Sequence, residues 1–240
     1  MKRSIGISLG ILLACGSVSF AQTNVLSQNA VGYVKVSINE DELEMVSYDF
    51  LDIDGNPTTI SDVAGDQLPV GSRAFLWNPA GQSFVIENFQ AGLKAAADAW
   101  APDSNPIAPG DGLFLEAATG GASASYDVFM TGEVPGENNN SGTSTVAIAD
   151  GLSLSGYPYP ANVAWTSTTL AAGATVGDRF IGWDSAGQSY DIANFQPGLK
   201  AAADAWSNPG EIIEPGNGFF YDNSSGGGYD WTELKPYAFP

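Results

Sequence analysis

The sequence predicts an all-β fold, with two tandem β-sandwich or barrel-like repeats of about 100 residues and little helix. Short runs of alternating apolar and polar residues are separated by turns rich in Gly, Pro, Asn and Asp. Residues 80–100 recur as residues 186–206, with four substitutions in 21 positions. We therefore divide the chain into a first unit at 22–134, a linker at 135–143 and a second unit at 144–240.

The first unit opens with two predicted strands. Gly32–Ile38 alternates Tyr, Lys and Ser with Val and Ile, which is typical of a half-buried strand, and Leu43–Phe50 forms a second one. Asp52–Pro57 has the composition of a turn, and Thr58–Ala64 has room for one helical turn.

A hairpin turn is the most specific local prediction. The predicted strand Ser72–Asn78 runs into the turn Asn78–Gly81, in which Pro suits the second position and Gly the position that needs a positive φ. Asp184–Gly187 has the same chemistry in the second unit. Two different sequences with one turn chemistry indicate the same hairpin in both units.

Beyond the turn, the two copies differ on one face of the strand only. Phe84 and Ile86 match Tyr190 and Ile192, so bulky apolar residues persist at alternate positions, whereas Val85 and Glu87 are replaced. The pattern predicts that the persistent residues face the core and that the others face solvent.

The rest of each unit contains further short elements. Leu93–Trp100, with three alanines, favours a short helix. Leu113–Leu115 and Phe219–Tyr221 are apolar on both faces, which indicates central strands covered on both sides. The remaining predicted strands are Tyr126–Val128, Thr145–Ile148, Leu152–Tyr159 and Tyr229–Trp231.

The first 21 residues have the features of an export signal. A basic start at Lys2 and Arg3 precedes ten apolar residues, and Ser19–Ala21 forms a small-x-small cleavage site. The alternative is a lipoprotein signal, in which Leu12–Cys15 is a lipobox and Cys15 carries the lipid anchor. Both readings predict a secreted, extracellular or periplasmic protein, and no later segment is long and apolar enough to span a membrane.

Composition excludes several chemistries. The chain has no histidine, and its only cysteine, Cys15, lies in the signal, so the processed chain has no disulfide and no Cys/His metal site. Without Lys2 and Arg3, six basic residues stand against 27 acidic ones, a net charge of −21. Such a charge disfavours nucleic acid as a partner. It suits an acidic, solvated surface.

Matched cations in the two copies point to structural ion pairs. Arg73 matches Arg179, and Lys94 matches Lys200. In so acidic a chain each is expected to meet a carboxylate. Asp98 and Asp204 lie four residues after the lysines, within reach if that stretch is helical. The alternative function for these cations is an anion site.

Two pairs of tryptophans are matched as well. Trp77 and Trp183 share a strand face with apolar neighbours, and we expect them to pack in the core. Trp100 and Trp206 precede polar loops and are the candidate ligand-binding residues, because an exposed ring beside amides can stack on a saccharide. Core packing is the competing interpretation for this pair too.

Asp52 and Asp54 are weak candidates for a calcium site. The run Asp52–Asn56 places oxygen donors at alternate positions, as a calcium loop does. Pro57 stands where an EF-hand needs Gly, and no Glu closes the loop. A polar turn is the simpler interpretation, and we expect no metal and no cofactor.

No motif indicates catalysis. The chain has neither a histidine base nor a Gly-x-Ser-x-Gly elbow, and its Gly-Asp-Gly and Gly-Asn-Gly runs lead into strands instead of phosphate-binding helices. Carboxylate pairs suited to glycoside hydrolysis are the one remaining option.

Several motifs resemble a family of secreted, repeat-containing bacterial proteins of verrucomicrobial type. They are Asn29–Val34 after the signal, Pro109–Phe114 and Pro215–Phe220 (Pro-Gly-x-Gly-Leu/Phe-Phe), Gly132–Pro135, Trp231-Thr232 and Lys235–Tyr237. The resemblance covers nearly the whole mature chain. It implies a secreted β-rich protein and assigns no activity and no functional residues.

Three functions follow as hypotheses. The first is a non-enzymatic protein with a structural or adhesive role at the cell exterior, whose partners are extracellular polysaccharide or other surface proteins. The second is a carbohydrate-binding module that uses exposed aromatic residues. The third is an enzyme that degrades an extracellular polymer.

Overall fold

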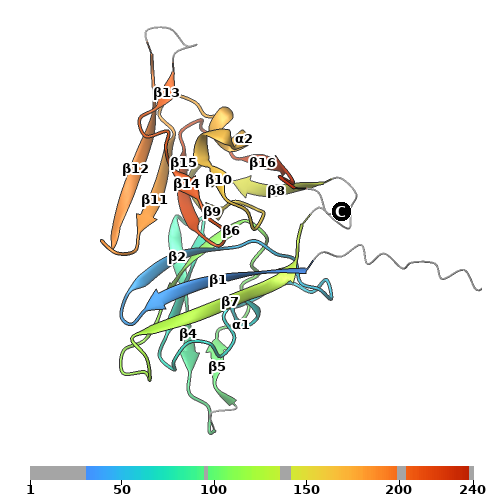
Figure 1. Ribbon diagram of the computed structural model, residues 1–240, viewed down its shortest axis with the longest axis vertical. Coiled ribbons are helices and arrows are strands. Elements are labelled where there is room, and N and C mark those ends of the chain that lie inside the picture. Colours follow the sequence, from blue (N-terminus) through green and yellow to red (C-terminus); the bar gives the residue numbers. More distant parts are fainter. Residues whose placement is uncertain (1–30, 95–96, 136–141, 199–203, 238–240) are drawn as a thin grey trace, which may run out of the picture.

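Two stacked units make up the molecule. The computed structural model describes residues 31–94, 97–135, 142–198 and 204–237. Figure 1 shows residues 31–135, from blue to green, in one half and residues 142–237, from yellow to red, in the other. Nearly all of the regular structure is antiparallel strand, so the predicted all-β class is confirmed.

The elements follow the same order in the two halves of the chain. The first unit contains β1 (Val31–Asn39), β2 (Leu43–Tyr48), α1 (Ile60–Val63), β3 (Arg73–Asn78), β4 (Ser83–Gln90), β5 (Ala99–Ala101), β6 (Asp111–Glu116) and β7 (Ser125–Glu133). The second contains β8 (Thr143–Ile148), β9 (Gly151–Gly156), β10 (Val163–Ala164), η2 (Trp165–Ser167), α2 (Thr169–Ala172), β11 (Arg179–Asp184), β12 (Ser189–Gln196), β13 (Ala205–Trp206), β14 (Ile212–Ile213), β15 (Gly218–Asn223) and β16 (Tyr229–Leu234).

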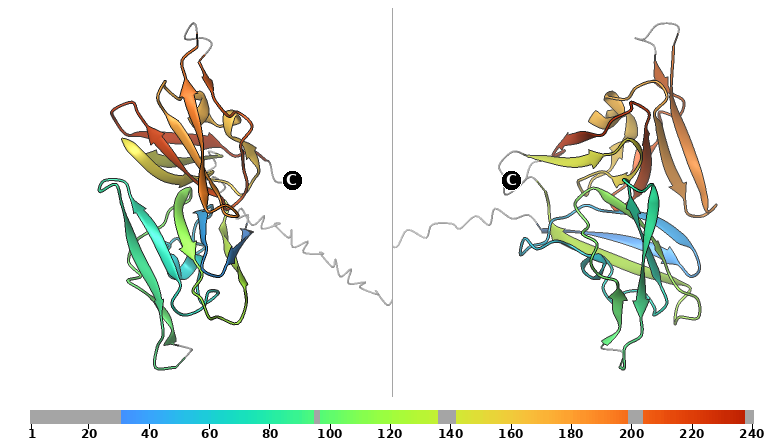
Figure 2. Two further views of the ribbon diagram at one scale, coloured as in Figure 1. Left: turned by 90° about the vertical axis from the view of Figure 1, so that its left-hand side faces the viewer. Right: turned by 180° about the vertical axis from the view of Figure 1, so that it is seen from behind.

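One ten-stranded sheet runs through both units. Its order is β13-β12-β11-β15-β9-β6-β3-β4-β5, and β2 pairs with β6 beside this path. The order ends at two edge strands, so the sheet does not close separately within each unit as a barrel-like repeat would. The two views in Figure 2 show the units joined along the long axis of the molecule.

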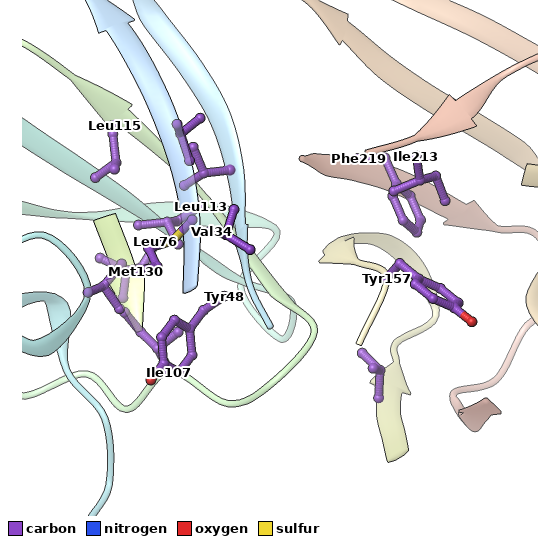
Figure 3. Packing of buried hydrophobic residues seen from close by; sticks show 14 of the residues in the cluster. Val34, Tyr48, Leu76, Ile107, Leu113, Leu115, Met130, Tyr157, Ile213 and Phe219 are labelled. Atoms are coloured by element: carbon purple, nitrogen blue, oxygen red, sulfur yellow. The ribbon is translucent and has the colours of Figure 1, made fainter. Parts of the chain in front are cut away.

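A two-stranded sheet covers one face of the large sheet in each unit. β1 pairs with β7 and β8 pairs with β16, all antiparallel. The main hydrophobic core fills the space beneath and is continuous between the units, from Val34 and Ile38 in β1 to Trp231 in β16. Figure 3 shows Val34, Leu113 and Met130 on one side and Phe219 and Ile213 on the other.

β6 and β15 are central strands, as predicted. Leu113 and Leu115 face the main core, while Phe114 between them faces a second cluster on the opposite side of the sheet. Phe220 in β15 faces the same second cluster. The apolar residues on both faces reflect this double covering.

The hairpins form where predicted, but the left-handed residue differs. β3 pairs with β4 and β11 pairs with β12. The positive φ angles fall on Gln82 (46°) and Gln188 (47°), and not on Gly81 or Gly187. Contacts made by the two glutamine side chains, described below, hold this conformation.

The predicted faces of β4 and β12 are reversed. Phe84 and Ile86 are 38% and 44% exposed, and Tyr190 and Ile192 are both 49% exposed, whereas Glu87 is fully buried. Alternation shows that two faces differ but not which one the main core covers. Here Phe89 and Ala193 face that core, and the bulky matched residues lie on the other side of the sheet.

Three smaller predictions need correction or fall outside the described residues. The described part of 93–100 contains no α-helix and leads into β5, and residues 95 and 96 are not described. The proposed linker at 135–143 overlaps β8, which begins at Thr143, and residues 136–141 are not described. The export signal and leader lie outside the described residues.

Candidate functional site

Trp100 and Trp206 are buried, so the structure contradicts their proposed role in sugar stacking. Their exposed fractions are 4% and 8%. The indole of Trp100 donates to the carbonyl of Gly65 at 2.8 Å, and that of Trp206 donates to the carbonyl of Ala171 at 3.3 Å. Their rings pack within the main core, where no ligand can stack on them.

The Asp52–Asn56 run forms a turn closed by its own hydrogen bonds. One carboxylate oxygen of Asp52 accepts from the amides of Asp54 and Asn56, both at 2.9 Å. Within the described ranges, no three His, Cys, Asp or Glu side chains converge as metal ligands. The simpler interpretation, a polar turn, fits this geometry.

The matched arginines form the predicted ion pairs. Arg73 binds Glu116 through two hydrogen bonds of 2.5 and 2.7 Å, and Arg179 binds Asp222 with Nε at 2.8 Å and Nη2 on the same oxygen. Both arginine side chains are nearly half exposed. Each pair therefore contributes at most about 1 kcal/mol.

The expected pairing of the lysines with Asp98 and Asp204 is wrong where it can be checked. Asp98 accepts from the amide of Gly92, and Asp204 accepts from the amide of Gly198, both at 2.7 Å. Within the described ranges, no ion pair joins Lys94 to a carboxylate. Lys200 lies outside these ranges. The two aspartates close the loops that precede β5 and β13.

The side of the large sheet opposite the two-stranded sheets carries an aromatic surface shared by both units. We call it the aromatic face. It comprises Phe75, Trp77, Phe84, Ile86 and Phe114 of the first unit and Trp183, Tyr190, Ile192 and Phe220 of the second. Phe114 and Phe220 are buried at its centre, and the tryptophans are partly buried around them. Phe84, Ile86, Tyr190 and Ile192 are its exposed part.

Aromatic contacts across the units hold this face together. The ring centroids of Trp77 and Phe220 are 5.3 Å apart, and those of Trp183 and Phe114 are also 5.3 Å apart, both edge to face. Phe84 also contacts Phe220, with centroids 6.3 Å apart. Such pairs contribute roughly 0.5–1.5 kcal/mol beyond their burial. Trp77 and Trp183 therefore join the units, and do not belong to one core each.

Hydrogen bonds at the hairpin ends also join the two units, in the same way on both sides. Gln82 and Leu152 exchange two hydrogen bonds of 3.0 Å between the side-chain amide and the backbone. Gln188 binds the backbone of Leu43 in the same way, at 3.0 and 3.1 Å. The indoles of Trp77 and Trp183 donate to the same two carbonyls. Identity of the glutamines in the two copies was the signal that our sequence reasoning missed.

One turn of each unit also packs against the other unit; we call these two the exchanged turns. Gly216, with φ +80°, inserts its turn beside β1, where an added Cβ would lie 2.5 Å from Val34 Cγ1. Gly110, with φ +88°, approaches Val146 of β8 in the same manner, at 2.4 Å. Only glycine fits either position, because of both the positive φ and the close contact.

A buried carboxyl group anchors the inserted turn of the second unit. Asp49, which is 1% exposed, accepts from the Ser47 hydroxyl at 2.7 Å and from the Gly216 amide at 2.9 Å. Burial raises the pKa of Asp49 to about 7, and the two hydrogen bonds partly oppose this. The same position in the second unit is Pro158, so the inter-unit bond made by Asp49 has no counterpart there.

A groove of about 360 Å³ opens where the units meet. β3, β4 and β6 of the first unit form one side, and β8 and β9 of the second unit form the other. We call this cavity the junction groove. Its polar lining residues include Asn105, Asp111, Ser153 and Ser155. Burial raises the pKa of Asp111, and the bond from the Ala108 amide, 2.8 Å long, opposes that rise.

Comparison with known proteins identifies no relative: no family model matches the chain, and neither the curated proteins nor the solved structures contain a match. The resemblance to secreted repeat proteins therefore stays a prediction. Within the described residues, no helix combines the length and apolar character that a membrane crossing requires.

Proposed function

We propose that this protein is a non-enzymatic, exported protein with a structural or adhesive role at the cell exterior. The observation that supports the proposal is the aromatic face. It exposes Phe84, Ile86, Tyr190 and Ile192 at matched positions of the two units. Contiguous apolar surface of this kind is characteristic of interaction sites.

The physical argument concerns which positions keep their apolar character. On one side of the hairpin strand the two copies differ in character: β12 has Asp191 in place of Val85 and Ala193 in place of Glu87. On the other side they agree, since Phe84 and Ile86 of β4 are matched by Tyr190 and Ile192. Half-exposed side chains gain less from burial in the free protein than core residues do. A partner that covers both hairpins supplies the rest of that burial, which makes the face suited to adhesion.

Fractionation of cells that produce the protein tests this role. We expect the protein to be retained on cells or extracellular matrix, and the Phe84→Ser/Tyr190→Ser variant to be released. Tyr33→Ser is the matched control, because Tyr33 is 72% exposed on β1, whose sheet covers the other face of the large sheet. A wild-type protein found free in the medium would count against the proposal, and so would equal retention of both variants.

The carbohydrate-binding hypothesis loses its original site, because Trp100 and Trp206 are buried. The polymer-degrading enzyme has no observation that favours it. Neither is part of this proposal.

A further inference from the structure

The junction groove differs from the matching position in the other half of the molecule. There, the residues that match Trp77, Asn105, Asp111 and Leu113 enclose only about 80 Å³. Ligand pockets commonly measure about 300–1,000 Å³. Of the two positions, only the junction groove reaches that size.

Two substitutions place larger side chains at or beside the second position, where Glu211 also replaces Asn105. Leu115 of β6 and Tyr221 of β15 are matched positions in the two units. Leu115 pairs with Glu44, whereas Tyr221 pairs with Ser153. Ser153 therefore occupies the position that Glu44 has in the other half. Glu44 extends to the hydroxyl of Ser185, the counterpart of Pro79, which lines the junction groove. Leu113 is replaced by the larger Phe219. The second position is thus filled by side chains that the first one lacks.

The walls of the junction groove combine an apolar surface with uncharged hydrogen-bonding groups. Leu76, Leu113 and Leu154 supply the apolar part, and Ser153 and Asn105 are among the polar groups. The Asn105 amide donates to Glu87, which is fully buried and has one carboxylate oxygen without a partner. Asn105 is therefore held in place before any ligand arrives.

The charges select the ligand class. Among the described residues that line the groove there is no Lys or Arg, while Asp111 lines it and Glu87 lies behind it. An anion would meet no balancing positive charge there and would face the carboxyl groups of Asp111 and Glu87, so phosphates and carboxylates are disfavoured. Hydroxyl groups can both donate to Asp111 and Asn105 and accept from the serines. An apolar wall suits the C–H face of a sugar ring.

We propose that the junction groove binds a neutral saccharide of one or two residues, held by Asn105, Asp111, Ser153 and Ser155. Of the residues of the aromatic face, Trp77 alone is among the described lining of this groove, and the exposed side chains of that face lie outside it. The groove can therefore bind a sugar whether or not the face is adhesive. It also places carbohydrate recognition at a position different from Trp100 and Trp206.

Chemical-shift mapping on the wild-type protein is the first test, because it requires no variant to fold. Glucose, galactose, N-acetylglucosamine, maltose and cellobiose form the neutral panel, and glucosamine and glucuronate are the charged probes. We expect at least one neutral sugar to shift the signals of Asn105, Ser153 and the Trp77 indole in a saturable manner. Shifts outside the groove only, binding of a charged probe alone, or no binding would overturn the proposal.

Two variants then imitate the filled position. Ser153→Glu and Leu113→Phe introduce the residues that close the equivalent site, and each is expected to weaken sugar binding at least tenfold. Ser125→Glu, an exposed change on β7 outside the groove, is the control. Binding that persists unchanged in both folded groove variants would refute the assignment.

Discussion

Asp49 lies where the turn of the second unit enters the first, and its buried carboxyl group forms no ion pair with any described residue. Its hydrogen bonds to Ser47 and Gly216 support the charged form, yet burial raises its pKa to about 7. Burial also raises the pKa of Glu44 to about 7, although its hydrogen bond with the Ser185 hydroxyl opposes the rise. Ser185 belongs to the turn between β11 and β12, so Glu44 lies where the hairpin of the second unit contacts the first unit. The junction between the units therefore contains two carboxyl groups that titrate near neutral pH.

The Asp49→Asn variant should change how stability depends on pH. The folded pKa lies above the unfolded value of about 4, so the folded protein holds the extra proton between pH 4 and 7. The contribution of Asp49 to the free energy of unfolding is thus fully present below about pH 4 and is lost as the pH rises to about 7. Relative to wild type, the variant should gain up to about 4 kcal/mol across this window.

Urea unfolding of both proteins at several pH values measures this difference. Glu44 titrates in both proteins, so its effect cancels in the comparison. Parallel stability curves for the two proteins would show that Asp49 does not titrate as described.

Gln82 is the second residue whose role extends beyond its own unit. Its side-chain amide makes two hydrogen bonds with the backbone of Leu152 and donates a third to the Pro79 carbonyl, while its own φ of 46° is costly for a residue with a Cβ. We expect Gln82→Ala to lower the free energy of unfolding by roughly 1–3 kcal/mol, because it removes all three side-chain hydrogen bonds and keeps the strained φ. Gln82→Gly should cost less, since it relieves the strain. Equal losses for the two variants would argue against a strained conformation held by the amide.

At the scale of elements, the exchanged turns decide how the units meet. Gly216 and Gly110 each combine a positive φ with a contact in the other unit that leaves no room for a Cβ. β2 and β9 each bind one turn and one hairpin glutamine of the other unit. β2 contacts the Gly216 turn and Gln188, and β9 contacts the Gly110 turn and Gln82. The junction therefore uses strand ends and turns in addition to the strand faces that carry the aromatic contacts.

Alanine substitution separates the two constraints on these turns. Gly226 has nearly the same φ, +81°, but nothing lies within 4 Å of its missing Cβ. Gly226→Ala should therefore cost only the backbone strain, roughly 1–2 kcal/mol. Gly216→Ala adds a Cβ 2.5 Å from Val34 and should cost clearly more, roughly 3–5 kcal/mol. Thermal or urea unfolding compares them, and equal costs would mean that the junction yields easily.

At the scale of the whole molecule, the units share one sheet, one main core and one aromatic face. The main core extends from β1 to β16, and the second cluster draws Met45 and Phe114 from the first unit and Leu154, Ile181 and Phe220 from the second. A unit separated from its partner would expose this second cluster to water. Exposing apolar surface to water costs about 25 cal/mol for each Å². This cost opposes the unfolding of one unit while the other stays folded.

One cooperative unfolding transition is the expected consequence. Residues 31–237 should unfold with coincident midpoints by tryptophan fluorescence and far-ultraviolet circular dichroism, and with equal calorimetric and van't Hoff enthalpies. Two separate transitions would show that the units are energetically independent despite their shared sheet.

The sequence by itself determined the all-β class, the longer strands, the hairpins and the arginine ion pairs, whereas the short strands β5, β10, β13 and β14 were not predicted. These features depend on neighbours in the chain or on residues matched between the two copies. Alternation in β4 and β12 also showed that their two faces differ.

Only the tertiary structure decided which face the main core covers, that Trp100 and Trp206 are inside, and that Trp77, Trp183 and the glutamines reach across the junction. The reason is physical: local patterns report periodicity and turn chemistry, whereas burial depends on which distant layer packs on each face. Here that layer includes the other unit, to which no local pattern points.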